Sequence, residues 1–245
     1  MNDARLYKRT IVKEEIRSEA LGATRKIRVY LPPGYDERIS YPVFYCQDGE
    51  EFFNYGRIAT HANRMILDDN VPPFLIVGVD VDLPNRTAQY APEGEQFAAY
   101  CRFFTEEMMP AVEQKFTVQA STEGRILAGD SLGGTVSLHL ALDYPHLFSK
   151  VLALSGAFLG STHTRVAREK DLSRLKVYML VGTEETAVST GRGVFNFLEA
   201  NRQTRRLLEE RRARLKYEEK TGKHLWGFWQ QELPEGMRFL LNQAE

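Results

Sequence analysis

The sequence predicts an α/β fold with a mostly parallel central sheet and helices on both of its faces, and two observations support this. Short apolar runs, Gly-containing loops and helical patterns alternate along the chain, which is typical of strands connected through helices. Most of these runs are continuously apolar, as expected for strands that helices cover on both faces. The predicted strands are Ile27–Leu31, Val43–Cys46, Phe74–Val79, Arg125–Ala128, Val151–Leu154, Val177–Val181 and Leu215–Glu219.

Three further segments have recognisable patterns. The first thirty residues predict a leading antiparallel hairpin, closed by a rigid Pro-rich turn at Leu31–Tyr35. Apolar side chains recur every three or four residues from Phe97 to Val112, which predicts a helix that Pro110 kinks or divides. The last helix carries its apolar stripe over Leu233–Leu241 and is expected to cover the sheet.

Two segments, Leu83–Glu95 and Gly160–Asp171, fit no regular pattern. We expect them to be loops that shape a pocket, since functional residues concentrate on loops held by a scaffold. Cys46 and Cys101 lie outside any metal-ligand spacing. We therefore expect both thiols to be buried, and we expect neither a metal nor a cofactor.

Length and composition limit the classes of protein that the chain can represent. Its 245 residues are 43% hydrophobic and 27% charged, so one core without disulfides is feasible and residues 1–245 are expected to form a single domain. The 32 basic and 33 acidic side chains leave a net charge of −1, which favours neither nucleic acid nor an anionic membrane as a partner. Met1–Lys13 lacks the apolar stretch of a signal peptide. We expect a cytoplasmic protein, and the oligomeric state stays open.

The strongest functional signal is Gly-x-Ser-x-Gly at Gly129, Ser131 and Gly133, which directly follows a predicted strand and precedes a helical pattern. A sharp strand-to-helix turn exposes the central side chain, and glycine two residues to either side removes collisions. The helix N-terminus then favours negative charge developing beside Ser131. The alternative is that Ser131 only caps the helix.

A serine nucleophile needs a base and an orienting carboxylate, which in this type of fold follow in the order acid, then histidine. Glu184 and Glu185 come directly after the predicted strand Val177–Val181, and either one fits the position of the acid. Among the five histidines, only His224 follows them in the sequence. The order therefore selects His224 as the base.

The sequence resembles the esterases of the α/β-hydrolase superfamily that include enterochelin esterase, esterase D, some feruloyl esterases and the mycolyltransferases. The resemblance spans most of the chain and rests on several short motifs. They are Val29–Tyr35, Tyr41–Val43 leading to Asp48-Gly49, Arg86 with Tyr90 and Pro92, Gly129–Gly134, and His224–Trp226 with Trp229. The resemblance implies an α/β-hydrolase fold and a serine carboxylesterase that acts on a small-molecule ester.

The resemblance also implies roles that spacing does not supply. The backbone N–H groups of Leu132 and Glu50 would form the oxyanion hole, and Glu185 is preferred to Glu184 as the acid. The segment Gly191–Arg214, which is predicted to be helical, departs from the shortest members. Arg86 is a candidate for holding an anionic substrate group.

Trp226 is a candidate for lining an acyl pocket, with packing of the last helix as the alternative. The substrates implied by the family range from siderophore lactones to small aryl and alkyl esters. Two other functions stay open from the sequence: an acyltransferase with the same triad, and a non-catalytic binding protein.

Overall fold

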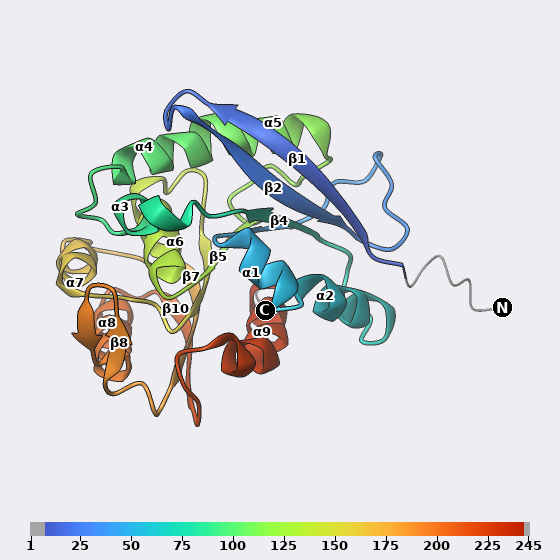
Figure 1. Cartoon of the computed structure of the whole chain (residues 1–245). Helices are drawn as coiled ribbons and strands as arrows, with labels where there is room; N and C mark the ends of the chain where they lie inside the picture. Colours follow the sequence, from blue (N-terminus) through green and yellow to red (C-terminus); the bar gives the residue numbers. More distant parts are fainter. Residues whose placement is uncertain (1–7, 243–245) are drawn as a thin grey trace.

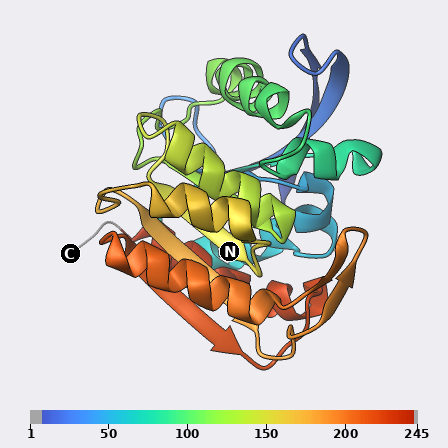
Figure 2. The ribbon, with the colours of Figure 1, turned by 90° about the vertical axis from the view of Figure 1, so that its left-hand side faces the viewer.

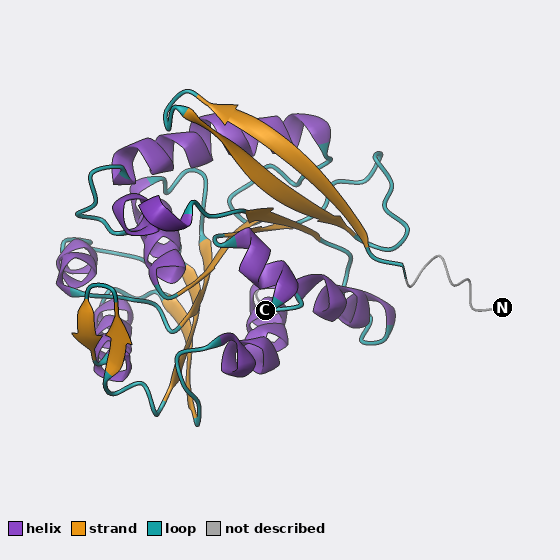
Figure 3. Cartoon of the chain, viewed as in Figure 1, coloured by secondary structure: helices purple, strands orange, loops and turns teal. Residues whose placement is uncertain are grey.

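The computed structural model describes residues 8–242, and a mixed α/β sheet forms its centre (Figures 1 and 3). Within these residues eight strands make one sheet in the order β1-β2-β4-β3-β5-β6-β7-β10. The leading strands β1 and β2 pair antiparallel, as do β2 and β4, whereas every pairing from β4 to β10 is parallel. The predicted fold class is confirmed.

Every predicted strand is present, and several extend further than their apolar residues. The extensions carry charged or small residues that the apolar pattern does not mark. The strands of the sheet are β1 Thr10–Ser18, β2 Ala23–Leu31, β3 Val43–Cys46, β4 Leu75–Val79, β5 Arg125–Asp130, β6 Lys150–Leu154, β7 Lys176–Gly182 and β10 Arg214–Lys220. A separate antiparallel hairpin consists of β8 Val188–Thr190 and β9 Gly193–Phe195.

Helices cover both faces of the sheet (Figures 1 and 2). Because successive side chains of a strand point to opposite faces, strands β2 to β7 each contribute to two apolar clusters. One cluster includes side chains of α1 Gly49–Asn54, α2 Ile58–Leu67 and α9 Trp226–Leu241. The other includes side chains of α3 Arg86–Tyr90, α4 Phe97–Arg102, α5 Met109–Lys115, α6 Leu132–Asp143, α7 Gly160–Ala167 and α8 Phe197–Glu210.

The helix predicted around Pro110 is divided as expected. A π-helical segment, η2 Phe103–Met108, separates α4 from α5, and Pro110 lies in the first turn of α5. There its missing N–H breaks no hydrogen bond of α5. Cys46 and Cys101 are both buried free thiols, as predicted.

Three predictions about local structure are wrong. The leading hairpin turns at residues 19–22, where Gly22 has a φ of 61°, and the Pro-rich segment follows β2 instead of closing the hairpin. The segment Leu83–Glu95 contains the 3₁₀ turn η1 Leu83–Asn85 and α3. The segment Gly160–Asp171 begins with α7, so both of the expected loops contain helical structure. The segment Gly191–Arg214 begins with the tip of the β8–β9 hairpin before α8.

Candidate active site

Ser131 lies at the sharp turn between β5 and α6, and its backbone has a φ of 50° and a ψ of −121°. Non-glycine residues with positive φ are strained by about 1–3 kcal/mol and are often found at functional sites. A Cβ on Gly129 would lie 2.1 Å from the carbonyl carbon of Gly133. The turn therefore requires glycine at position 129, as the spacing predicts.

The start of α6, directly after Ser131, has a backbone N–H group without a partner in the helix. The Ser131 side chain makes no capping hydrogen bond to α6, so the interpretation of Ser131 as a simple helix cap is wrong. Leu132 is the first residue of α6, and the first N–H groups of a helix have no partner within it. The Leu132 N–H is thus available beside the serine.

A second helix N-terminus lies next to this turn. A Cβ on Gly133 would stand 3.0 Å from Oδ2 of Asp48 and 3.1 Å from Cβ of Gln47, so the end of β3 lies against the start of α6. Glu50 is the second residue of α1, and its exposed carboxylate turns away to Arg28, 3.0 Å from Nη2. The Glu50 N–H belongs to the unpaired first turn of that helix.

Asp48 and Arg86 hold the loop that leads into α1. Nε and Nη2 of Arg86 donate to the two carboxylate oxygens of Asp48 at 2.9 and 2.8 Å, and the guanidinium lies over the ring of Tyr90. Burial works to lower the pKa of Arg86, but the charge and hydrogen bonds of Asp48 outweigh it and the pKa is raised. Arg86 is thus bound to Asp48, with no need of a substrate anion.

The carboxylate of Asp130 is buried beside this ion pair. Burial, followed by repulsion from Asp48, raises the pKa of Asp130 well above its usual range. The guanidinium of Arg86 works in the opposite direction. The residue directly before Ser131 therefore favours the neutral form, which keeps a second negative charge away from the site.

Glu185 and His224 meet just beyond the carboxyl ends of the paired strands β7 and β10. Oε2 of Glu185 lies 2.7 Å from Nδ1 of His224, and the Glu185 side chain is completely buried. Glu184 instead is exposed, with its carboxylate 3.8 Å from Nζ of Lys223. Of the two adjacent glutamates, Glu185 is the one that contacts the predicted base.

The loops that carry these two residues run side by side. Thr183 N–H donates to the Lys220 carbonyl at 2.9 Å, and Glu184 N–H donates to the Gly222 carbonyl at 3.1 Å. A Cβ on Gly182 would lie 2.3 Å from the Gly222 carbonyl oxygen. Glycine at position 182 therefore lets the loop of His224 approach the end of β7.

Ser155 was not predicted from the sequence, although it holds the Glu185 carboxylate. Its hydroxyl donates to Oε1 of Glu185 at 2.6 Å and accepts from Nε1 of Trp229 at 2.8 Å. Gly182 N–H also donates to Oε1, at 2.8 Å. Ser155 directly follows β6 and has a φ of 47°. A serine directly after a predicted strand, the position of Ser131 after β5, was the signal that could have found it.

Phe197 connects Ser131 with His224. The Phe197 ring stacks on the His224 imidazole, with centroids 4.5 Å apart and planes 12° from parallel, and it lines a cavity of about 140 Å³ together with Ser131 and Leu132. Within residues 8–242 no hydrogen bond joins the Ser131 hydroxyl to His224. Such bonds are often long before substrate binds.

Trp226 lies outside this cavity. Its Nε1 donates to Oε2 of Glu51 at 2.7 Å, and its ring packs edge-on against Phe52, with centroids 4.8 Å apart. These contacts anchor the start of α9 to α1. The structure thus places Trp226 in packing of the last helix rather than in the wall beside Ser131.

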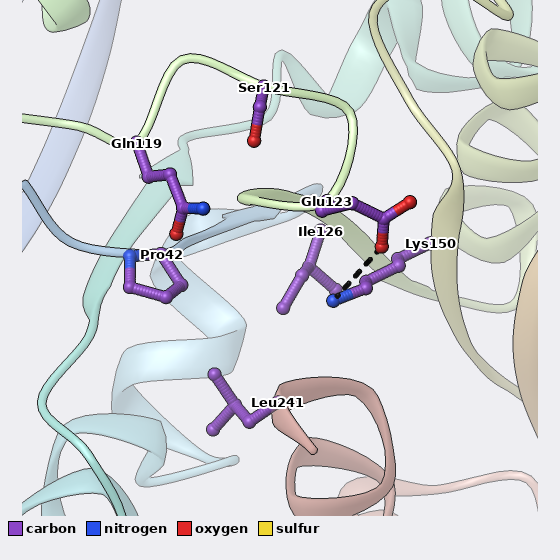
Figure 4. A pocket seen from close by; sticks show the side chains of 7 residues that line it. All are labelled: Pro42, Gln119, Ser121, Glu123, Ile126, Lys150 and Leu241. Carbon is purple, nitrogen blue, oxygen red and sulfur yellow. Dashed lines mark ion pairs between the residues drawn. The ribbon is translucent and has the colours of Figure 1, made fainter. Parts of the chain in front are cut away.

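A larger cavity, of about 380 Å³, is lined by Pro42, Ile126 and Lys150 among others (Figure 4). These residues lie at the beginnings of β3, β5 and β6, whereas Ser131 follows the end of β5. In this larger cavity Lys150, the first residue of β6, faces Glu123 at 3.7 Å. None of the predicted catalytic residues lines this cavity. In the described part of the chain, no group of three or more His, Cys, Asp or Glu residues could hold a metal ion, and no helix is long and apolar enough to span a bilayer.

Comparison with known proteins identifies a family and a relative of similar length. The model of the family described as "Putative esterase" matches residues 18–240. The uncharacterized protein YjcH from Bacillus subtilis is 33% identical over 234 residues, which cover 95% of this chain and 98% of the relative.

Two solved structures are similar at lower identity. The enterobactin esterase FES from Shigella flexneri, determined in the presence of enterobactin, has a TM-score of 0.81 and is 19% identical over 94% of this chain and 59% of its own. A ferulic acid esterase has a TM-score of 0.78 and is 17% identical over 95% and 99%, respectively. At these identities the two structures establish the fold.

Proposed function

Because the chain belongs to the esterase family of the α/β-hydrolase superfamily, and is thus a serine ester hydrolase, we propose that Ser131, His224 and Glu185 are its catalytic triad. The reaction is the hydrolysis of a carboxylic ester through an acyl-enzyme on Ser131. One observation carries the proposal: the buried Glu185 carboxylate contacts Nδ1 of His224 at 2.7 Å, and the Phe197 ring that stacks on His224 lines the same cavity as Ser131.

Acylation begins when the Ser131 hydroxyl attacks the ester carbonyl carbon and its proton moves to Nε2 of His224. Glu185 accepts the hydrogen bond of the Nδ1 proton, which fixes the tautomer and stabilises the charged ring. The carbonyl oxygen becomes an oxyanion, and the N–H groups of Leu132 and Glu50 donate to it. Collapse of the intermediate expels the alcohol, which takes the proton from His224.

Deacylation repeats these steps with water as the nucleophile. His224 takes a proton from water, the hydroxide attacks the acyl carbon, and the carboxylic acid leaves as Ser131 recovers its proton. Arg86 acts in both halves as a positioning residue, because it clamps Asp48 just before the helix that carries the Glu50 N–H. The match of the family model to residues 18–240 supports one esterase domain over the chain.

The substrates that we propose are small alkyl or aryl esters. Leu132, Ala157, Leu159, Phe195 and Phe197 give the cavity beside Ser131 an apolar wall. The cavity is small, about 140 Å³, which favours short acyl and alcohol groups. A siderophore lactone is the larger alternative, suggested by the similarity to an enterobactin esterase.

The proposal is tested by labelling with an active-serine phosphonate and by hydrolysis of p-nitrophenyl esters of increasing chain length, beside a triscatecholate lactone. We expect phosphonate to label the wild type, and Ser131→Ala to lose labelling and about 10⁶ in turnover. Ser137→Ala is the matched control, since Ser137 lies in α6, the helix that directly follows Ser131, and its hydroxyl has no partner among the described residues. Activity that survives in Ser131→Ala would rule the mechanism out.

A further inference from the structure

The cavity beside Ser131 has a distinct charge pattern. Apolar side chains and the hydroxyls of Thr87 and Thr190 line it, together with the guanidinium groups of Arg86 and Arg192. Neither Asp nor Glu lines it. A neutral ester would need no guanidinium there, so the state of each arginine determines what the cavity can recognise.

Arg86 is not available to a ligand. Its Nε and Nη2 are both used by Asp48, whose side chain is 1% exposed. Because Asp48 is buried, removing its partner would leave an uncompensated buried charge. A substrate anion that competed for Arg86 would therefore disturb the loop that leads to Glu50.

Arg192 differs from Arg86 in that one nitrogen of its guanidinium, rather than two, donates a hydrogen bond within the described residues. It lies at the tip of the β8–β9 hairpin, the small pair of strands set apart from the large sheet in Figure 3. Its Nη2 donates to Oε1 of Glu93, and its side chain remains 28% exposed. Among the described residues, its Nε and Nη1 have no hydrogen-bond partner. Arg192 and Ser131 both line the same cavity.

The backbone of the hairpin tip is held in place. Thr190 Oγ1 donates to the Gly193 carbonyl at 2.9 Å and accepts from the Arg192 N–H at 3.1 Å. Glu93 in turn accepts from the Ser161 hydroxyl at 3.1 Å, so one carboxylate joins the hairpin to the start of α7. The guanidinium is thus presented by an ordered turn, which reduces the cost of ordering it around a ligand.

We propose that Arg192 is a specificity-determining residue that binds a carboxylate on the ester substrate. The inference rests on the proposed function of Ser131. A planar guanidinium with free donors suits a carboxylate, which can accept two parallel hydrogen bonds. The small volume of the cavity, about 140 Å³, favours a short chain between the ester and the carboxylate.

The experiment compares esters that differ only in charge. Monoethyl succinate carries the carboxylate on the acyl side, and ethyl succinamate replaces it with a neutral amide of the same shape. Carboxymethyl butyrate and its amide do the same on the alcohol side. Hydrolysis is followed by proton release, and rates are expressed per serine labelled by phosphonate, so that incompletely folded protein does not count.

We expect wild-type kcat/KM to be at least about tenfold higher for the charged member of one pair, as one charge-assisted interaction provides. Arg192→Met should lower that ratio by about tenfold, and Arg192→Lys should lower it less. Arg205→Met is the control, because Arg205 is an exposed arginine of α8 that pairs with Glu209. Its ratio should equal that of the wild type.

Glu93→Gln provides a second test that leaves Arg192 in place. Removing the competing carboxylate should lower KM for the charged ester several-fold, with little change in kcat. A wild-type ratio of one or less in both pairs, or an unchanged ratio in Arg192→Met, would overturn the role of Arg192. Failure of the proposed function looks different: no ester is hydrolysed and Ser131 is not labelled.

Discussion

The carboxylate of Glu185 lies 2.7 Å from the imidazole of His224, although 39 residues separate them in the chain. Parallel pairing of β7 with β10 brings the ends of these strands together, and glycine at position 182 lets the loop of Gly222 approach the end of β7. The buried carboxylate and the ring form a unit that Ser155, Trp229 and Phe197 hold in place.

Replacing Glu185 by Gln should lower kcat by about 10⁴. The amide keeps the shape of the side chain, but it can neither stabilise the charged imidazole nor reliably fix its tautomer. Glu184→Gln is the matched control, since its exposed carboxylate contacts only Lys223 at 3.8 Å among the described residues, and its kcat should stay near the wild-type value. The measurement is the steady-state kcat of both variants. An equal loss of kcat in the two would contradict the assignment of Glu185 as the acid.

Ser155→Ala should lower kcat about tenfold to a hundredfold, because the carboxylate of Glu185 loses one of the donors that hold Oε1. Trp229→Phe separates this effect from stability. It removes the indole donor to Ser155 but keeps the bond from Ser155 to Glu185, so it should cost about 1–2 kcal/mol of unfolding free energy and little kcat. Urea unfolding and kcat are measured for both. If Ser155 had only a structural role, both variants would lose unfolding free energy and neither would lose much kcat.

Gly129→Ala should abolish phosphonate labelling and destabilise the protein by about 3 kcal/mol, the upper end of the cost of overpacking. The new methyl group would meet backbone atoms of Gly133 at 2.1 and 2.2 Å, and backbone at the start of α6 cannot move without displacing Ser131. Gly160→Ala serves as the control, because no atom lies within 4 Å of a Cβ there. Thermal unfolding would show the contrast, and a stable, labelled Gly129→Ala would disprove the predicted turn geometry.

His139 should make stability depend on pH. Burial lowers the pKa of this ring from 6.5 to about 4, so between these values the unfolded chain binds the proton and the folded protein does not. The contribution of the neutral His139 ring to the free energy of unfolding is therefore complete above about pH 6.5. It is lost as pH falls toward 4, by up to about 3 kcal/mol.

His139→Gln tests this expectation, since an amide can keep the hydrogen bond to Thr162 but does not titrate. Urea unfolding at pH 7, 5.5 and 4.5 should give a shallower loss for the variant than for the wild type. Part of the wild-type loss should remain, because burial also lowers the pKa of His61 and His163. Identical slopes for the two proteins would contradict the role of His139.

The fold was predictable wherever a segment is buried on both faces. Strands such as β3 Val43–Cys46 are continuously apolar, and that pattern depends only on local sequence. The short helix α7 was missed because only Thr162 and Val166 in it are buried. A polar helix of this kind is stabilised by packing on the rest of the protein, which periodicity does not report.

In the candidate site, too, some features were predictable from local sequence and others were not. The turn at Ser131 was readable because its cause, close approach of Gly129 to Gly133, lies within five consecutive residues. The partners of the two arginines were not readable. Arg86 binds Asp48 and Arg192 binds Glu93 across 38 and 99 residues of chain, and nothing in the spacing distinguishes a guanidinium that is occupied from one with free donors.

By itself, the sequence determined the order of the chemical groups along the chain: a serine at a sharp turn, then acidic residues, then one histidine. These features arise from backbone sterics and from residue order, which are local or one-dimensional. Only the tertiary structure decided which glutamate turns inward, which serine supports it and which arginine keeps free donors beside Ser131. Those choices depend on burial and on hydrogen bonds between distant segments, and such contacts exist only once the sheet has brought the strand ends together.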